Sequence, residues 1–407
     1  MRSSKRILTK LTLIPVHFLV QSLNKFKKES KIWRIDETQY EKLKQKWIEL
    51  GAARIVPAVH FHKHHSTLIH QIKCETKHYN QNNITRTAAY LTFFKKHPEI
   101  HWSFLAHMVS RNAGYFMSDL KGEFLPHLMK NSVAEQLYLM LEKGNSLIFQ
   151  DAFPQLLLYE ESKKKKQSLF YLCKHFNVSL FMEGVWELFF AGDASPLLPI
   201  AQIINEQSHI EQHLIQSKEF QFLKKSLPFR FQNWLQLSQI IFPVIPLKNS
   251  TGKTMKDFDR LNKRISLGKN LYVLLFQKKF YDRIFKFACI QTHTGSRKDY
   301  DPEVFSNKSF QNEIVKEKLS FFKTKNAQIY SPELLKVWKE NYTGPFFPSN
   351  WFANQKIDIS LFSLEKTMKH TIWLTYWAGL HKTEAAYLLK AYFKQKKRCL
   401  ISWHLFK

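Results

Sequence analysis

The sequence predicts a mainly α-helical protein, a globular array of many helices with little or no sheet. Apolar residues recur at helical spacing in EQLYLMLEK, VWELFF and ELLKVW. Glycine is scarce, at 11 of 407 residues, which disfavours dinucleotide-binding βαβ folds and β-propellers. Hydrophobic residues make up 44% of the chain, which is enough for a packed core.

Start and stop signals place the first helices. Asp36 is expected to cap a helix that runs through Lys46 and ends before Gly51. Thr85 is expected to cap the helix AAYLTFFKK, which Pro98 ends because proline cannot continue a helix. The next helix is predicted to begin at Pro98, since the first helical turn tolerates proline.

Similar signals place the helices that follow. The helix that begins at Pro98 is expected to end at Gly114. A capping box at 132–135 is expected to begin a helix that closes at Gly144. The apolar run 240–247 contains two prolines, which argue against a central strand.

Soft boundaries divide the chain into three predicted parts. Residues 1–50 form a basic N-terminal arm plus one helix, 51–228 form a helical lobe, and 229–407 form a second helical lobe. The lysine run at 163–166 is predicted to mark an exposed turn, because four like charges repel one another and stay hydrated.

The formal net charge of +29 predicts attraction to polyanions such as anionic lipid, nucleic acid or phosphorylated substrates. Lysine predominates, without interleaved arginine and base-stacking motifs, which argues against specific nucleic-acid recognition. Four widely spaced cysteines without a CxxC motif argue against a disulfide framework. They fit a reducing, cytoplasmic location.

The N-terminal arm has two interpretations. Basic residues precede the apolar stretch LTLIPVHFLV, but Pro15 and His17 interrupt it, and no small-residue cleavage site of a signal peptide follows. No run reaches the ~18 apolar residues that span a bilayer. Residues 1–34 are therefore either an ordinary disordered or packed arm, or an amphipathic arm that contacts an anionic membrane, at the inner membrane surface.

The segment 83–124 carries the strongest functional signal. It places polar side chains among aromatic ones, and a polar group buried without a partner costs roughly 1–3 kcal/mol. On a helix that begins at Pro98, His107 and Arg111 share one line, and His101 and Asn112 lie along the adjacent line.

The preceding helix is expected to aim Arg86 and Tyr90 at the same interior. A buried arginine must be paired, and the acidic residues considered are Glu99, Asp119 and Asp299. Two interpretations stay open. The segment is either a satisfied polar core that fixes helix register, or the wall of a pocket that binds an anion.

A second signal is the string HTGSRKDY, at 293–300. It offers hydroxyl groups, a flexible glycine and an arginine, which suit a phosphate or a carboxylate. The alternative is a helix-terminating turn in which Asp299 pairs with Arg297 or Lys298. A cysteine-phosphatase loop is excluded, because seven rather than five residues separate Cys289 from Arg297.

Other motifs fail on spacing or composition. His70, Cys74 and His78 recur every four residues and are weak candidates for a metal site, without an obvious fourth ligand, so no metal is predicted. Gly252-Lys253-Thr254 lacks the earlier glycine of a phosphate loop and is expected to be a turn before a helix. GxSxG and HExxH do not occur, and the sequence names no cofactor.

The two strings ITRTAAYLTFFKKHPEIHWSFLAHMVSRNAGYFMSDLKGEF and HTGSRKDY resemble the YppC-like family of bacterial proteins. The resemblance covers most of the chain from about residue 80 to 350. It implies that both strings belong to one functional unit. It implies no particular activity, catalytic residue or cofactor.

Together these observations predict an internal polar pocket for a phosphorylated or carboxylated small molecule, with hydrolase or transferase chemistry as the enzymatic hypothesis. The alternatives are a non-enzymatic basic protein that docks on anionic membrane or nucleic acid, and a structural protein of the cell or spore. The residues proposed for proton transfer are His101, His107 and Asp299. Those proposed for ligand binding are Arg86, Tyr90, Arg111, Asn112, Asp119, His293, Ser296, Arg297 and Tyr300.

Overall fold

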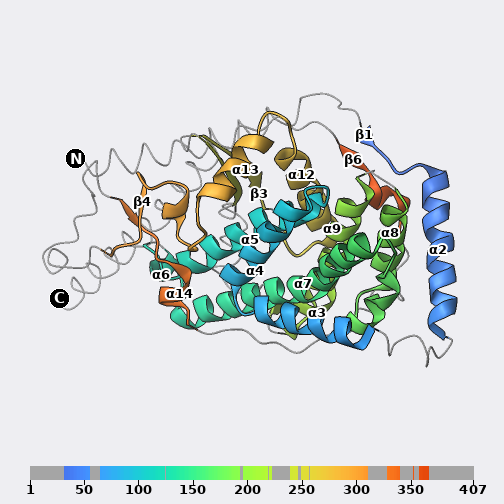
Figure 1. Ribbon diagram of the computed structural model, residues 1–407. Helices are drawn as coiled ribbons and strands as arrows, with labels where there is room; N and C mark the ends of the chain where they lie inside the picture. Colours follow the sequence, from blue (N-terminus) through green and yellow to red (C-terminus); the bar gives the residue numbers. More distant parts are fainter. Residues whose placement is uncertain are drawn as a thin grey trace, which may run out of the picture.

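Helices make up most of the computed structural model, which confirms the predicted class (Figure 1). The structure describes residues 32–55, 65–123, 125–192, 196–218, 220–221, 239–245, 249–255, 257–309, 328–339, 352 and 357–365. Its helices are α2 (Glu37–Ile55), α3 (Ser66–Tyr79), α4 (Asn83–Lys96), α5 (His101–Asp119), α6 (Leu125–Leu128), α7 (Asn131–Lys165), α8 (Leu180–Phe190), α9 (Leu197–Ile210), α12 (Leu261–Leu275), α13 (Tyr281–Ile290) and α14 (Leu334–Val337). Its strands are β1 (Ile32–Trp33), β2 (Gln239–Val244), β3 (Asn249–Thr254), β4 (Phe305–Ser306), β5 (Ile329–Tyr330) and β6 (Leu364–Glu365).

The sheets of the described residues are small, as predicted, and each has two strands. β2 and β3 form an antiparallel pair from Gln239↔Thr254 to Val244↔Asn249. The expectation for 252–254 was therefore wrong, because these residues lie in β3 rather than in a turn before a helix. A side chain at Gly252 would collide with the Ile240 backbone of β2, so close strand approach explains this glycine.

Local signals placed the start of α2 and the end of α4 correctly, whereas α5 begins at His101 rather than at Pro98, and α7 begins at Asn131 without the predicted capping box. The Asp36 carboxylate accepts a hydrogen bond from the Gln39 backbone N–H at the start of α2. α4 ends at Lys96, two residues before Pro98. Its cap is Asn82 rather than Thr85, because Asn82 and Thr85 form a capping box in which Thr85 is the third helical residue.

The glycine stop signals were wrong at three places. α2 continues past Gly51, α5 past Gly114, and α7 past Gly144. A glycine inside a helix costs only about 1 kcal/mol relative to alanine, which favourable packing of the helix outweighs. The turn predicted at 163–166 begins only at Lys166, because Lys163–Lys165 form the last turn of α7 and Lys166 is its left-handed cap, at φ 54°.

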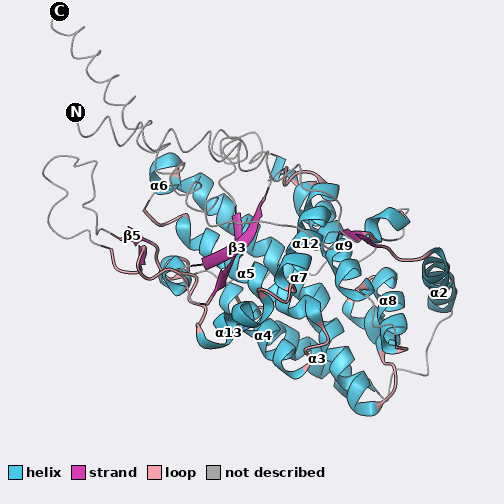
Figure 2. Cartoon of the chain, turned by 90° about the horizontal axis from the view of Figure 1, so that it is seen from above, coloured by secondary structure: helices cyan, strands magenta, loops and turns pink. Residues whose placement is uncertain are grey.

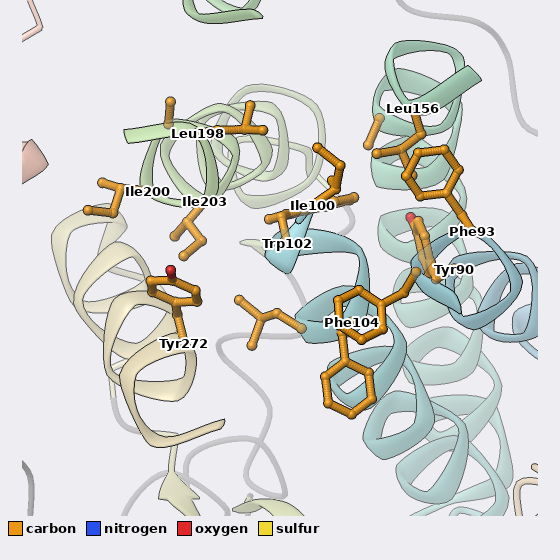
Figure 3. Close-up of a cluster of buried hydrophobic side chains, with 14 of the residues drawn as sticks. Tyr90, Phe93, Ile100, Trp102, Phe104, Leu156, Leu198, Ile200, Ile203 and Tyr272 are labelled. Carbon is orange, nitrogen blue, oxygen red and sulfur yellow. The ribbon is translucent and has the colours of Figure 1, made fainter. Parts of the chain in front are cut away.

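The larger hydrophobic core lies where α4, α5, α7, α9 and α12 meet (Figure 3). Phe104 is fully buried and stacks on Phe94, with ring centroids 4.9 Å apart. Tyr90 meets Trp102 edge to face, with centroids 5.5 Å apart. Aromatic side chains thus supply much of this core, and such pairs add about 0.5–1.5 kcal/mol beyond area burial.

α2 stands at one end of the molecule, and the β4–β5 sheet lies toward the other (Figures 1 and 2). The larger core draws side chains from both of the predicted lobes, for example Phe104 and Tyr272. The boundary near 228 and residues 1–31 of the basic arm lie outside the described residues, so the domain division stays a prediction. Among the described helices, none has the length and hydropathy to cross a bilayer.

We predict that Phe104→Ala lowers the free energy of unfolding by about 3–5 kcal/mol, because it leaves a cavity among four aromatic rings. Chemical denaturation measures this loss. Ile48→Ala is the control, since Ile48 on α2 is 73% exposed and its truncation should change stability by less than about 0.5 kcal/mol. Equal losses in the two variants would contradict the assignment of this core.

Candidate functional site

The HTGSRKDY loop (293–300) follows α13 and packs against α5. The loop contacts both α4 and α5 at Gly114 of α5. There the Nε2 atom of His293 lies 2.9 Å from the Oδ1 atom of Asn83 on α4. A Cβ atom at Gly114 would lie 2.7 Å from His293 Nε2 and closer still to Asn83 Oδ1. Gly114 is thus needed for the loop to approach the helices.

Arg111 of α5 is buried beneath this loop, with 1% of its surface exposed. Its guanidinium donates to the backbone carbonyl of Gln291 at 2.8 Å and to the Tyr115 hydroxyl at 3.1 Å. It also lies over the Phe287 ring, 4.8 Å from the centroid. The carboxylate that faces it belongs to Asp299, at 3.9 Å between Nη2 and Oδ2.

Asp299 organises the loop itself. Its two carboxylate oxygens accept hydrogen bonds from the backbone N–H of Thr294, at 2.8 Å, and from the Thr294 hydroxyl, at 2.7 Å. Asp299 Oδ2 also lies 3.7 Å from His293 Nδ1. The carboxylate therefore faces Arg111 and His293, and not Arg297 or Lys298 as the alternative interpretation supposed.

The outer part of the site is a second charged pair. Arg297 donates from Nε to the Asp119 carboxylate at the end of α5, and from Nη1 to the Tyr300 hydroxyl at 2.6 Å. The side chains of Arg297 and Asp119 are 15% and 21% exposed, so solvent reaches this pair. Tyr115 links the two parts, because its ring contacts both His293 and Tyr300.

We call this group the α5–loop cluster. Its members come from α4, from α5 and from the HTGSRKDY loop. They are Asn83, Arg111, Tyr115, Asp119, His293, Arg297, Asp299 and Tyr300.

Burial shifts the protonation of the cluster. It lowers the pKa of His293 to about 4, although Asp299 opposes the shift, so the imidazole is neutral at pH 7. It raises the pKa of Asp119, against the lowering effect of Arg297. It also raises the pKa of the Tyr115 hydroxyl, which stays protonated.

Arg86 belongs to a different part of the protein. It forms a buried ion pair with Glu142 of α7, and both side chains are 1% exposed. It also donates to the Asn80 side chain at 3.0 Å. None of the acidic residues considered from the sequence is this partner.

The remaining predicted residues of α4 and α5 have other contacts. Tyr90 packs in the hydrophobic core. His101 stacks on Phe276 and lies 3.1 Å from the Tyr272 hydroxyl. Asn112 pairs with the backbone N–H and C=O of Ile241 in β2, at 2.8 Å each. These side chains are engaged away from the α5–loop cluster.

His107 and Ser296 also serve local contacts. The Nδ1 atom of His107 lies 2.7 Å from the Thr87 carbonyl, and burial places the pKa of His107 well below its usual value. The Ser296 hydroxyl donates to the Ser331 carbonyl at 2.6 Å and accepts from the Lys298 backbone N–H. These hydrogen bonds of Ser296 therefore stabilise the conformation of the loop.

The weak metal candidates lie on α3, where Cys74 Sγ and His70 Nε2 are 3.4 Å apart. Within the described ranges, no three His, Cys, Asp or Glu side chains converge as metal ligands would.

Asn83, Gly114 and Thr294 were not predicted as site residues. Asn83 and Gly114 lie inside the strong segment, but their roles depend on a loop about 200 residues away. Thr294 lies in HTGSRKDY, five residues before Asp299. Its hydroxyl group, close in sequence to a carboxylate in a glycine-containing turn, was the signal that could have predicted this contact.

The fold and the cluster define a mainly helical protein in which a distant loop completes a buried polar site on one central helix. A family model described as "Protein of unknown function (DUF2515)" matches residues 78–391, and the chain belongs to this family. It is 40% identical over 237 residues to "Uncharacterized protein YppC" of Bacillus subtilis (strain 168), over 58% of this chain and 73% of that protein. No solved structure gives a significant match. The resemblance to the YppC-like family is thereby confirmed.

We predict that Arg86→Met lowers the free energy of unfolding by about 3–5 kcal/mol, because it leaves the Glu142 charge buried and unpaired. The double variant Arg86→Met with Glu142→Leu should recover most of this loss, since it removes both charges. Urea denaturation of the three proteins measures both effects. A double variant as unstable as the single one would show that the pair does not form.

His293 should make the protein less stable in acid. Its folded pKa, about 4, lies below the unfolded value of ~6.5, so its contribution to stability is complete above pH 6.5. The contribution is lost as the pH falls toward 4, by about 3 kcal/mol at most. The unfolding free energy of His293→Gln should therefore fall less than that of the wild type over this range. Parallel pH profiles would contradict the burial of a neutral His293.

Proposed function

We propose that the α5–loop cluster binds a phosphorylated or carboxylated small molecule and that the protein hydrolyses this ligand or transfers a group from it. Arg111 and Arg297 would hold the anion. His293 and Asp299 would transfer protons. The observation that carries the proposal is the weak compensation of the buried Arg111 charge, whose facing carboxylate is 3.9 Å away.

The two buried arginines of α4 and α5 differ in how their charges are compensated. Arg86 makes a direct ion pair with Glu142, as a structural arginine should. The guanidinium of Arg111 instead donates to carbonyl and hydroxyl oxygens. The facing carboxylate, Asp299, already accepts two hydrogen bonds from Thr294. A ligand anion beside Arg111 would supply the compensation that Asp299 gives only at a distance.

The outer pair offers an entry for such a ligand. Arg297 and Asp119 are partly exposed, so a ligand anion could replace Asp119 as the partner of Arg297. The raised pKa of Asp119 eases this exchange, because the carboxylate that loses Arg297 can take up a proton instead of remaining as an unpaired charge. Tyr115 and Tyr300 would flank the ligand and strengthen its electrostatic contacts by excluding water.

Among the histidines, the geometry favours His293 for proton transfer. It lies within the cluster, beside Asp299. His101 is held on Phe276, and His107 is held by the Thr87 carbonyl. A role for His101 or His107 would require those contacts to break on ligand binding.

A second candidate function rests on the net charge of +29. It supports a basic protein that docks on an anionic membrane, with residues 1–34 as the contacting segment. Such docking would weaken steeply with salt, whereas binding at the buried cluster would depend on salt much less. A cytoplasmic location at the inner membrane surface fits both functions.

We predict that inorganic phosphate, used as the probe, stabilises the wild-type protein against thermal unfolding, by about 2.7 kcal/mol at a hundred times its Kd. Arg111→Gln should remove this stabilisation, because it removes the buried cation. Arg297→Gln should weaken it, because it removes the outer cation. Differential scanning fluorimetry measures the response, with chloride at equal ionic strength as the reference.

Lys298→Gln is the matched control, since it removes one positive charge from an exposed position of the same loop. It should respond to phosphate like the wild type. Circular dichroism checks that each variant is folded. A wild-type protein that phosphate leaves unchanged, or a Lys298→Gln variant that loses the response as fully as Arg111→Gln, would contradict the cluster as the anion site.

Docking is tested on the full-length chain with vesicles that contain anionic lipid, by cosedimentation at increasing salt. Binding that disappears with salt and is unaffected by Arg111→Gln would support the second function. No binding to anionic vesicles at low salt would exclude it.

A further inference from the structure

The hydrogen bonds of Asn83 determine which nitrogen of His293 carries the proton. The Asn83 amide nitrogen donates to the Ser110 carbonyl at 2.9 Å and to the Ser110 hydroxyl at 3.1 Å. A carbonyl only accepts, so the NH₂ group of Asn83 must face Ser110. Asn83 Oδ1 is therefore the atom that faces His293, and it accepts from Nε2–H at 2.9 Å.

The second nitrogen of a neutral His293 is then a lone-pair acceptor. A neutral imidazole carries one proton, and Nε2 holds it, so Nδ1 is unprotonated. Nδ1 is buried and has no hydrogen-bond partner among the described residues. It lies 3.7 Å from Asp299 Oδ2, which in turn lies 3.9 Å from Arg111 Nη2.

These three atoms suit one bridging water molecule. Both distances exceed a direct hydrogen bond, and a water molecule can bridge polar atoms that are too far apart to bond directly. A water molecule there could donate one hydrogen to His293 Nδ1 and the other to Asp299 Oδ2. It could accept from Arg111 Nη2, and three such bonds are typical of buried water.

We propose that Asn83 locks His293 as the Nε2–H tautomer, and that His293 Nδ1, Asp299 Oδ2 and Arg111 Nη2 together hold the water molecule that attacks the bound substrate. This inference rests on the proposed function and makes it hydrolytic. His293 is then a catalytic residue, because it touches the reacting water. Asn83 is a positioning residue, because it acts through His293.

The proposed step is hydrolysis by the water held at His293. The water oxygen forms a bond to the phosphorus or the carbonyl carbon of the substrate, and one water proton moves to His293 Nδ1. Asp299, whose Oδ2 atom lies 3.7 Å from this nitrogen, stabilises the resulting imidazolium through its negative charge. The bond to the leaving-group oxygen breaks, that oxygen keeps the electron pair, and the imidazolium returns the proton to it.

His107 provides an internal reference of opposite tautomer. Its Nδ1 atom lies 2.7 Å from the Thr87 carbonyl, which only accepts, so a neutral His107 carries its proton on Nδ1. The two buried histidines should therefore give different ¹⁵N signals in one spectrum.

The test is ¹⁵N NMR of the histidine-labelled full-length protein at pH 7, with signals assigned from His293→Gln and His107→Gln. We expect His293 as the Nε2–H tautomer and His107 as the Nδ1–H tautomer. In Asn83→Leu, which keeps the branched shape of the side chain but removes the acceptor, His293 should shift toward Nδ1–H, because Asp299 then offers the better acceptor. Asn83→Asp should restore Nε2–H, because a carboxylate oxygen still faces that nitrogen.

Two results would overturn the inference. One is a wild-type His293 with its proton on Nδ1. The other is an Asn83→Leu variant that is folded by circular dichroism and leaves the His293 signals unchanged. If Asn83→Leu does not fold, the wild-type spectrum alone decides.

The water molecule is tested by a crystal structure of the wild-type protein at a resolution that shows ordered solvent. We expect one water within hydrogen-bonding distance of His293 Nδ1, Asp299 Oδ2 and Arg111 Nη2. A direct His293–Asp299 hydrogen bond in its place would overturn the proposal. Both tests are made without a ligand. A failed phosphate response would therefore reject the proposed function, whereas the tautomer of His293 and the bound water would still be decided by their own tests.

Discussion

The hydrogen bond between Asn83 and His293 over Gly114 is the contact on which the α5–loop cluster depends. It joins residues 210 positions apart in the chain and holds the HTGSRKDY loop against two helices. Because a side chain at position 114 would occupy the same space, the helix must carry a glycine there. Through this contact the loop brings Asp299 to Arg111, and we propose that the same contact determines the proton position on His293.

Burial gives this arrangement its chemical character. A guanidinium, a carboxylate and a neutral imidazole lie together where water is largely excluded, so their interactions are stronger than at a surface. Arg86 shows how the same helix pair satisfies an arginine that has a purely structural role, by a direct pair with Glu142. This difference between the two arginines is the reason for proposing a ligand beside Arg111 and none beside Arg86.

The sequence predicted what depends on neighbouring residues and missed what depends on distant ones. Pro98 ended a helix as expected, and the helical class was correct, because these signals are local. Gly114 and Gly144 were misread as helix ends, because tertiary packing outweighs the cost of a glycine. The partner of Arg86, Glu142, could not be identified, since it lies on α7 and only the packing of α7 against α4 brings it near. Residues of the two strings meet in one cluster, but which of them meet could be known only from the fold.

The most direct test of this account is a double-mutant cycle between Asn83→Ala and His293→Ala, measured by chemical denaturation. If the loop is held on α4 and α5 by this hydrogen bond, the two substitutions should be coupled by about 1 kcal/mol or more, because either one removes the same interaction. Additive effects, within about 0.5 kcal/mol, would show that the two side chains do not meet over Gly114 and would contradict the account.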